Sequence, residues 1–286
     1  MTERAQTPSL ADLRADIDRI DETMHRLLME RGEIIDRLVA VKRNQTEGSA
    51  FRPAREAAMM RRLVERHHGL LPLDTVESIW RVIISTFTYV QAPYAVHADL
   101  SVGEPLMRDS ARFHFGFTTP FVPHVGARGV VDVVAASKGD LGLLPAAMVP
   151  GSDPWWTALE PANAPKIIAR LPFVDRADHP AGLPVFVVSH PINDAAVTEV
   201  EMFSVRVAGW SAKAAAAVSP LADVLAVSDG ALDGAALLVS VPHGGARDAV
   251  LDALRQSGAS VRSFIPVGSH AAPYRIGQGN AGSAGS

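Results

Sequence analysis

Two cationic side chains fall on the apolar face of a long predicted helix. Apolar residues spaced four and three apart run along residues 10–43, a pattern typical of a helix that packs against another helix. Arg31 takes a position of this seam where an apolar residue is expected, and Lys42, eleven residues further on, lies on nearly the same face. Buried cations are costly unless an anion meets them, so the pair indicates a site for a negatively charged molecule. The apolar seam comprises Leu13, Ile17, Ile20, Met24, Leu27, Ile34, Leu38 and Val41.

Gln91 is a third polar residue on an apolar helix face. It extends the face of a helix predicted to begin at Asp74, with Glu77 in a capping-box position, and to end before Pro93. The apolar residues of that face are Val76, Ile79, Trp80, Ile83, Ile84, Phe87 and Val90.

Each of these polar residues also has an ordinary explanation. Arg31 would pair with a glutamate of a partner helix, Lys42 would extend its charge into solvent near a helix end, and Gln91 would lie in a frayed last turn. A pocket for a dicarboxylate between helices explains all three at once.

The length of the first helix has a consequence for assembly. At 1.5 Å per residue it is roughly 50 Å long, more than a domain of under a hundred residues can cover. The sequence therefore predicts an intertwined dimer in which the seam packs against a second copy. A shorter second helix is expected to begin at Pro53 and to stop near His68, after a polar loop over residues 44–52.

Several segments of the first ninety residues match a known family in order and spacing. They are Leu13-Arg14, Ile17-Asp18, Ile20-Asp21, residues 27–31 (LLMER), residues 39–42 (VAVK), residues 52–56 (RPARE), residues 69–72 (GLLP), and Ile83-Ile84 leading to Gln91. In these segments the chain resembles the all-helical chorismate mutases.

The resemblance implies a pericyclic reaction, chorismate to prephenate, in which an ether C–O bond breaks while a C–C bond forms, without metal or cofactor. The protein holds a flexible dianion in its reactive shape and stabilises negative charge on the ether oxygen. By resemblance, Arg14 (from the other subunit), Arg31 and Lys42 hold the carboxylates, and Lys42 and Gln91 donate to the ether oxygen. Glu56 accepts from the ring hydroxyl, with Arg55 positioning it.

Two positions depart from the family pattern. Arg52 stands where an acidic residue is common, and Phe87 stands where a serine is common. Both count as substrate-binding positions, and either change lowers activity or shifts the substrate. The related helical isochorismate-pyruvate lyases share the fold, so another chorismate-derived substrate stays open.

Composition places limits on other functions. The chain has 286 residues, 48% of them hydrophobic, a net charge of -4 and no cysteine. Disulfides, thiolate metal sites and a cysteine nucleophile are excluded, and nucleic-acid binding is not expected because no basic face stands out. Ten histidines match no standard metal-ligand spacing. We expect a cytoplasmic protein with no signal peptide, no membrane span, no metal and no cofactor.

The remainder of the chain indicates an α/β domain over residues 98–275, so the predicted fold class is multi-domain, with an all-α domain (residues 1–94) followed by α/β. Residues 138–145 (KGDLGLLP) are similar to the prephenate dehydratase segment that leads into its Glu-Asn-Ser site, but here Ala146-Ala147-Met148 follow. Residues 236–267 faintly resemble a regulatory ACT module. We interpret this region as a degenerate, noncatalytic dehydratase-like domain, with a disordered tail over residues 276–286.

Expected strands lie at residues 130–134 (or a helix), 141–144, 185–188, 202–207, 236–241 and 260–267, and expected helices at 212–225 and 247–256.

The sequence thus favours a dimeric chorismate mutase of phenylalanine and tyrosine biosynthesis with an appended noncatalytic domain. Two alternatives stay open. One is a bifunctional chorismate mutase and prephenate dehydratase, and the other is a noncatalytic sensor of an aromatic-pathway acid.

Overall fold

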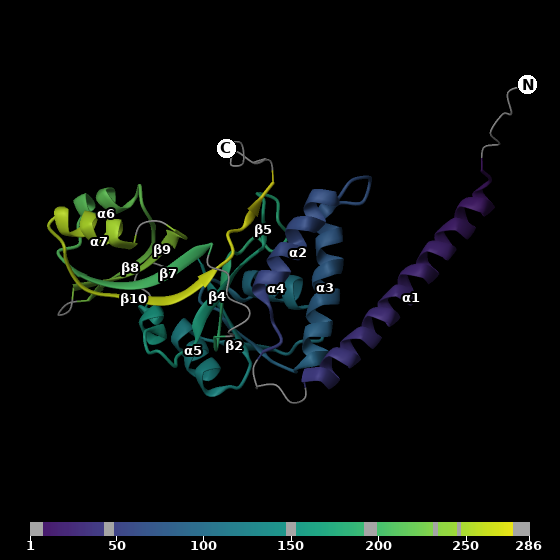
Figure 1. Cartoon of the computed structure of the whole chain (residues 1–286), viewed down its shortest axis with the longest axis horizontal. Helices are drawn as coiled ribbons and strands as arrows, with labels where there is room; N and C mark the ends of the chain where they lie inside the picture. The colour runs from purple at the N-terminus through teal and green to yellow at the C-terminus, as the bar shows by residue number, and fades with distance from the viewer. Residues whose placement is uncertain are drawn as a thin grey trace, which may run out of the picture. The chain divides into compact units, whose positions relative to one another are not determined.

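The computed structural model describes residues 8–42, 49–146, 153–191, 199–230, 234–244 and 247–276 (Figure 1). Contacts within the chain divide it into two compact units, Met1–Thr46 and Glu47–Ser286. The predicted helical domain of residues 1–94 spans both units. Its boundary stays a prediction, because contacts within one chain do not test which helices assemble with a second copy.

The first unit contains one helix, α1 (Leu10–Lys42), 33 residues long and drawn in purple in Figure 1. It begins at a capping box: the Asp12 amide donates to Ser9 Oγ at 3.2 Å, and the Ser9 amide donates to Asp12 Oδ2 at 2.9 Å. The bonds from Ser9 also lower the pKa of Asp12. The predicted seam is on the surface of this chain: Ile17 is 56% exposed, Leu27 55% and Val41 71%.

Two further helices begin the second unit. They are α2 (Pro53–Arg66) and α3 (Leu73–Gln91), and they pack against the sheet domain that follows. Pro53 is the first residue of α2, as predicted. The capping box predicted for α3 is wrong, since Pro72 caps that helix without a side-chain bond.

The sheet combines parallel and antiparallel pairs. Among the described residues nine strands join in the order β2-β1-β3-β6-β4-β10-β7-β9-β8, and β11 pairs with β5 separately. The strands are β1 (Val96–Asp99), β2 (Phe121–His124), β3 (Leu141–Pro145), β4 (Lys166–Leu171), β5 (Val174–Asp175), β6 (Val185–Ser189), β7 (Val200–Ala208), β8 (Asp223–Gly230), β9 (Gly234–Pro242), β10 (Ser260–His270) and β11 (Tyr274–Arg275).

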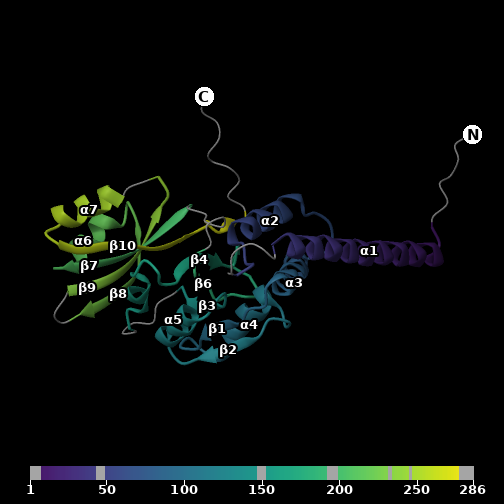
Figure 2. The same ribbon diagram turned by 60° about the horizontal axis from the view of Figure 1, so that its bottom comes forward.

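The first half of the sheet contains two parallel crossovers. Strand β1 pairs in parallel with both β2 and β3, and the connections pass through α4 (Glu104–Phe115) and α5 (Ala127–Ala136). These two helices cover opposite faces, because α4 shares a core with Val96 and Leu143 whereas α5 packs on Gly142 and Leu144. Figure 2 shows β1, β3, β6 and β4 side by side.

The second half is a βαββαβ module of β7, α6 (Ala212–Val218), β8, β9, α7 (Arg247–Gln256) and β10. Its strand order is β10-β7-β9-β8, and α6 and α7 pack together over one face (Figure 1). The strand–helix–strand unit predicted at residues 236–267 is confirmed as β9, α7 and β10.

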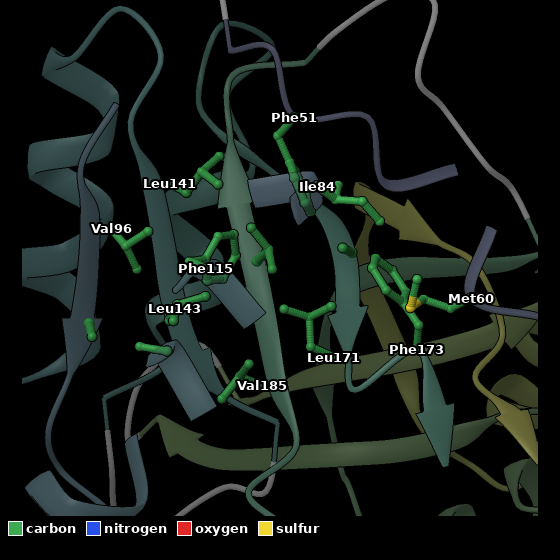
Figure 3. Packing of buried hydrophobic residues seen from close by; sticks show 14 of the residues in the cluster. Phe51, Met60, Ile84, Val96, Phe115, Leu141, Leu143, Leu171, Phe173 and Val185 are labelled. Carbon is green, nitrogen blue, oxygen red and sulfur yellow. The ribbon is translucent and has the colours of Figure 1, made fainter. Parts of the chain in front are cut away.

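The core on the α4 side joins the helices α2 and α3 to the sheet. Figure 3 shows Phe51, Met60 and Ile84 packed with Phe115 and Phe173 beside strands β3, β4 and β6. Burial of this apolar surface explains why α2 and α3 belong to the same compact unit as the sheet.

The fold decides one open alternative and corrects one prediction. The run at residues 130–134, expected as a strand or a helix, belongs to helix α5. The helix expected at residues 212–225 ends at Val218, before Pro220, and gives way to β8. The other expected strands are confirmed within one to three residues at their ends, and the 247–256 helix matches α7.

Gly268 allows β10 to approach β4 and so joins the two halves of the sheet. Its φ is +145°, and a Cβ added there would overlap the backbone carbonyl of Ile167, its register partner.

We expect Gly268→Ala to lower the free energy of unfolding by roughly 3 kcal/mol through backbone strain and overpacking. Gly129→Ala is the control, because that helical site has no atom within 4 Å and should be neutral or slightly stabilising. Urea unfolding of both variants measures this, and equal midpoints would contradict it.

Candidate functional site

Three of the predicted site residues lie on α1. Arg14 is exposed, and Arg31 is partly buried. Lys42 is the last residue of the helix, and its side chain lies outside the part that the structure describes. These cations belong to the first unit and the predicted residues of α2 and α3 to the second, so their meeting in one site stays a prediction.

The remaining predicted residues lie on α2 and α3 in the second unit. Arg52 caps α2, and its Nη1 donates to the carbonyl oxygens of Ser49 at 2.6 Å and Phe51 at 3.2 Å. Its guanidinium therefore folds back on the preceding loop. Arg55, one turn of helix further on, is exposed to solvent.

Glu56 is buried and already has a partner. It is 4% exposed, and Arg81 Nη1 donates to its Oε2 at 2.6 Å. Arg81 in turn donates from Nε and Nη2 to the carbonyl oxygen of His114 at 3.2 and 2.8 Å, and lies 5.4 Å from the centre of the Phe173 ring. A carboxylate has several acceptor positions, so Glu56 keeps capacity for a second donor. Arg81 thus holds Glu56 in one orientation.

Gln91 and Phe87 lie one turn apart near the end of α3, both partly buried. Gln91 Nε2 donates to the carbonyl oxygen of Phe87 at 3.0 Å. An amide nitrogen carries two hydrogens, so one donor of Gln91 is left over for a ligand.

A second buried network begins at Glu77 on the same helix. Glu77 is 0% exposed, accepting from Arg176 Nη1 at 2.9 Å and contacting His179 Nε2 at 3.2 Å. The Ala181 amide donates to His179 Nδ1 at 3.0 Å, so in the neutral ring Nε2 carries the proton and donates to Glu77. This explains why Glu77 does not serve as a capping residue.

The buried face of α3 differs from the predicted apolar one. It contains Val76, Glu77, Arg81, Ile84, Ser85 and Thr88, whereas Ile79 is 38% exposed and Val90 is 53% exposed. The polar members are buried because Arg81 and Glu77 find partners across the unit. Arg81 was not predicted from the sequence. The one feature that could have indicated its burial is its position four residues from both Glu77 and Ser85, which places the three on one helix face.

His114 is a buried histidine beside these networks. It is 1% exposed, and neither ring nitrogen has a hydrogen-bond partner among the described residues. Burial, followed by the charge of Arg81 and by His179, holds the pKa of His114 well below 6.5. His114 is therefore neutral at pH 7.

This shift predicts a pH dependence of stability. Below pH 6.5 the unfolded chain binds a proton at His114 that the folded chain refuses, so stability is present above pH 6.5 and falls with falling pH. The effect reaches about 1.4 kcal/mol per pH unit. Because carboxylates titrate nearby, the measurement is the difference in unfolding free energy between the native chain and His114→Phe from pH 7 to 5. A difference that does not change with pH would contradict the prediction.

Across the described residues no group of three or more His, Asp or Glu side chains is placed to hold a metal ion. Over the same residues, no helix combines the length and apolar character needed to cross a membrane.

The N-terminal helices match a known family model. Residues 13–92 match the model described as chorismate mutase type II. The N-terminal region is therefore a chorismate mutase type II domain.

Relatives and solved structures extend the comparison. A bifunctional chorismate mutase/prephenate dehydratase of Aquifex aeolicus is 29% identical over 140 residues, which cover 48% of this chain and 38% of the relative. A bifunctional enzyme of the same description from Pseudomonas aeruginosa is 30% identical, with 40% of its length covered. The chain thus spans well under half the length of these relatives.

A solved structure described as GqqA, a novel type of quorum quenching acylase, aligns with a TM-score of 0.40 at 15% identity, covering 62% of this chain and 95% of that one. Prephenate dehydratase from Streptococcus mutans aligns with a TM-score of 0.35 at 10% identity, covering 62% and 97%.

Proposed function

We propose that this protein is a chorismate mutase that rearranges chorismate to prephenate. The observation that carries the proposal is the family match over residues 13–92, within which Arg14, Arg31, Lys42, Arg55, Glu56 and Gln91 keep the residue types that the reaction needs. The rearrangement requires no proton transfer, so fixed cations and neutral donors are sufficient.

The roles divide between charge and positioning. Arg14, Arg31 and Lys42 bind the two carboxylates, and Lys42 with the free amide hydrogen of Gln91 stabilises the ether oxygen. Glu56, held by Arg81, accepts from the ring hydroxyl, and Arg55 positions it. Arg52 and Phe87 line the same site and modify its fit.

The active form is a dimer built on α1. Two apolar surfaces support this: the seam of α1, with Ile20 at 48% and Met24 at 50% exposed, and the outer face of α3, with Val82 at 45% exposed. Apolar patches of this extent mark association surfaces. In an intertwined dimer, Arg14 of one chain reaches the site formed by Arg31 of the other.

The dimer predicts a sharp effect of a charge on the seam. Ile20→Asp should shift the molar mass in light scattering from twice the 30.4 kDa of one chain toward the monomer, and turnover should fall with it. Arg26→Asp, one residue before Leu27 on the outward side of the helix, is the matched control and should remain dimeric. A native chain that scatters as a monomer would exclude the dimer.

A bifunctional mutase and dehydratase is the second candidate, favoured by the printed description of the relatives. Decarboxylation with loss of water needs an acid and oriented polar donors, and after Pro145 this chain has Ala146-Ala147-Met148. We therefore propose that the α/β part is noncatalytic toward prephenate.

Proton NMR of the products formed from chorismate by the full chain at neutral pH tests these proposals together. Prephenate as the sole product supports the mutase, and phenylpyruvate would support the bifunctional enzyme. A parallel run with isochorismate that yields pyruvate would identify a lyase. Binding of chorismate without any product would identify a sensor.

A further inference from the structure

A large pocket lies in the second unit where the βαββαβ module meets the rest of the sheet. Its volume is about 1210 Å³, which is more than enough for a ligand of a dozen heavy atoms. Strands β4, β6, β7, β8, β9 and β10 contribute to its lining, as do β11 and one face of α2. None of the residues proposed for the mutase reaction belongs to it.

Arg170 on β4 is one of the charged residues that line this pocket, together with Arg61, Glu65, Asp223 and Arg275. It is partly buried, and no hydrogen bond or ion pair joins its guanidinium to another described residue. Burial lowers the pKa of Arg170, an effect opposed by Asp175 and Asp223. Arginine stays protonated in proteins, so the pocket contains a partly desolvated cation whose planar fork is free for a carboxylate.

His270 on β10 lines the same pocket close to Arg170. Gly268 of β10 pairs with Ile167 of β4, and the two strands are parallel. His270 and Arg170 therefore lie at similar positions along neighbouring strands. The Nδ1 of His270 lies 2.8 Å from the carbonyl oxygen of Ala271, which requires a proton on Nδ1. Burial lowers the pKa of His270 to about 4, so the ring is neutral at pH 7 and Nε2 is an acceptor.

The remaining lining combines apolar side chains with polar ones, among them Glu65, Asp223 and Ser240. Phe186, Val200 and Leu225 line the pocket, and Phe186 lies 5.9 Å from His270 between ring centres. At the rim, Arg275 is paired with Asp175 at 3.4 Å and Arg61 lies over the Tyr274 ring at 5.7 Å. Arg170 thus offers a cation and His270 offers an acceptor beside an apolar wall, while the exposed residues Glu65 and Asp223 add carboxylates to the lining.

We propose that this pocket binds a small organic acid with a carboxylate, an adjacent hydroxyl and an apolar body: a 2-hydroxy acid. Arg170 receives the carboxylate in a two-point contact, and the hydroxyl donates to His270 Nε2. The apolar body packs on Phe186, Val200 and Leu225. A 2-amino acid fits less well, because its positively charged ammonium would lie beside the guanidinium of Arg170.

Calorimetric titration of the full chain with mandelate tests the proposal, with phenylacetate (no hydroxyl) and phenylglycine (ammonium) as comparison ligands. We expect mandelate to bind at least tenfold more tightly than either. Arg170→Gln should weaken mandelate binding roughly 10- to 100-fold, the range for a lost hydrogen-bonded charge. His270→Phe should reduce the affinity for mandelate to that for phenylacetate.

Two controls separate binding from folding and from the mutase reaction. Arg128→Gln, an exposed arginine paired with Asp132 on α5, should bind mandelate as the native chain does. Since Arg170 has no hydrogen-bonded or ion-paired partner within the described part of the chain, Arg170→Gln should keep the native melting temperature and chorismate turnover. Absence of mandelate binding, or equal mandelate affinity in the native chain and Arg170→Gln, would overturn the proposal. Equal affinity for mandelate and phenylacetate would overturn the assignment to hydroxy acids.

Discussion

Replacing Arg31 by alanine should reduce kcat/KM for chorismate by roughly 10²- to 10³-fold, the cost of losing one preorganised charged donor. The reason is that the substrate carries two carboxylates and accumulates negative charge as the ether bond breaks. A cation on the helix seam binds a carboxylate and stabilises the developing negative charge without any proton transfer. Steady-state loss of chorismate absorbance measures the effect.

Two companion variants make this test specific. Arg37→Ala removes an exposed arginine from the same helix, where its Nε contacts its own turn at the Glu33 carbonyl, and should leave turnover within twofold. Arg31→Lys keeps the charge but not the two-point geometry, so it should recover part of the activity. If Arg31→Ala and Arg37→Ala had the same modest effect, Arg31 would not belong to the site.

Replacing Glu77 by alanine should lower the free energy of unfolding by roughly 3 kcal/mol, because it leaves the largely buried guanidinium of Arg176 with only the exposed carboxylate of Asp178, 3.5 Å from its Nε. His179 Nε2 loses its acceptor as well. Urea unfolding followed by circular dichroism measures the change. This loss is large compared with the whole stability of a typical domain.

A double variant distinguishes the uncompensated charge from loss of packing. Glu77→Leu with Arg176→Leu removes both charges together and should recover most of the stability, since a buried ion pair contributes little over apolar residues of similar size. Glu104→Ala, which breaks an exposed pair with Arg108, should change stability by less than about 0.5 kcal/mol. A double variant as unstable as Glu77→Ala would refute this explanation.

Local periodicity was sufficient to predict α1, α2, α3 and α7 and the strands β3, β6, β7, β9 and β10, whereas α4 and the strands β1, β2, β4 and β8 were not predicted. The four-and-three spacing along residues 10–43 gave α1, and Pro53 marked the start of α2. Strands β6 and β9 are continuous apolar runs that read clearly in the sequence. These features depend on residues that are close together in the sequence, so the sequence alone is enough to predict them.

Pairings between distant residues were not predictable in the same way. Arg81 meets Glu56 twenty-five positions earlier, and Arg176 meets Glu77 ninety-nine positions earlier. Nothing in the spacing of either pair indicates a contact, and a charged residue on a helix is ordinarily solvated. The pocket of Arg170 and His270 was missed for the same reason, because its two key groups belong to strands far apart in the chain.

Of the candidate site, the residue pattern alone indicated Arg31, Lys42 and Gln91, and the resemblance supplied the other residues and all of the roles. The structure adds the partner of Glu56, the amide donor of Gln91 and the exposed seam of α1. The meeting of Arg31 and Lys42 with Glu56 and Gln91 stays a prediction, because it depends on the assembly of two chains.

The most direct test of the central claim is the rate at which the purified full chain consumes chorismate, followed by absorbance against the uncatalysed reaction. We predict a rate proportional to protein concentration and an acceleration of about 10⁶-fold or more, in the ordinary range of enzymes. A rate at micromolar protein indistinguishable from the uncatalysed one would contradict the assignment of the helical cations to this reaction.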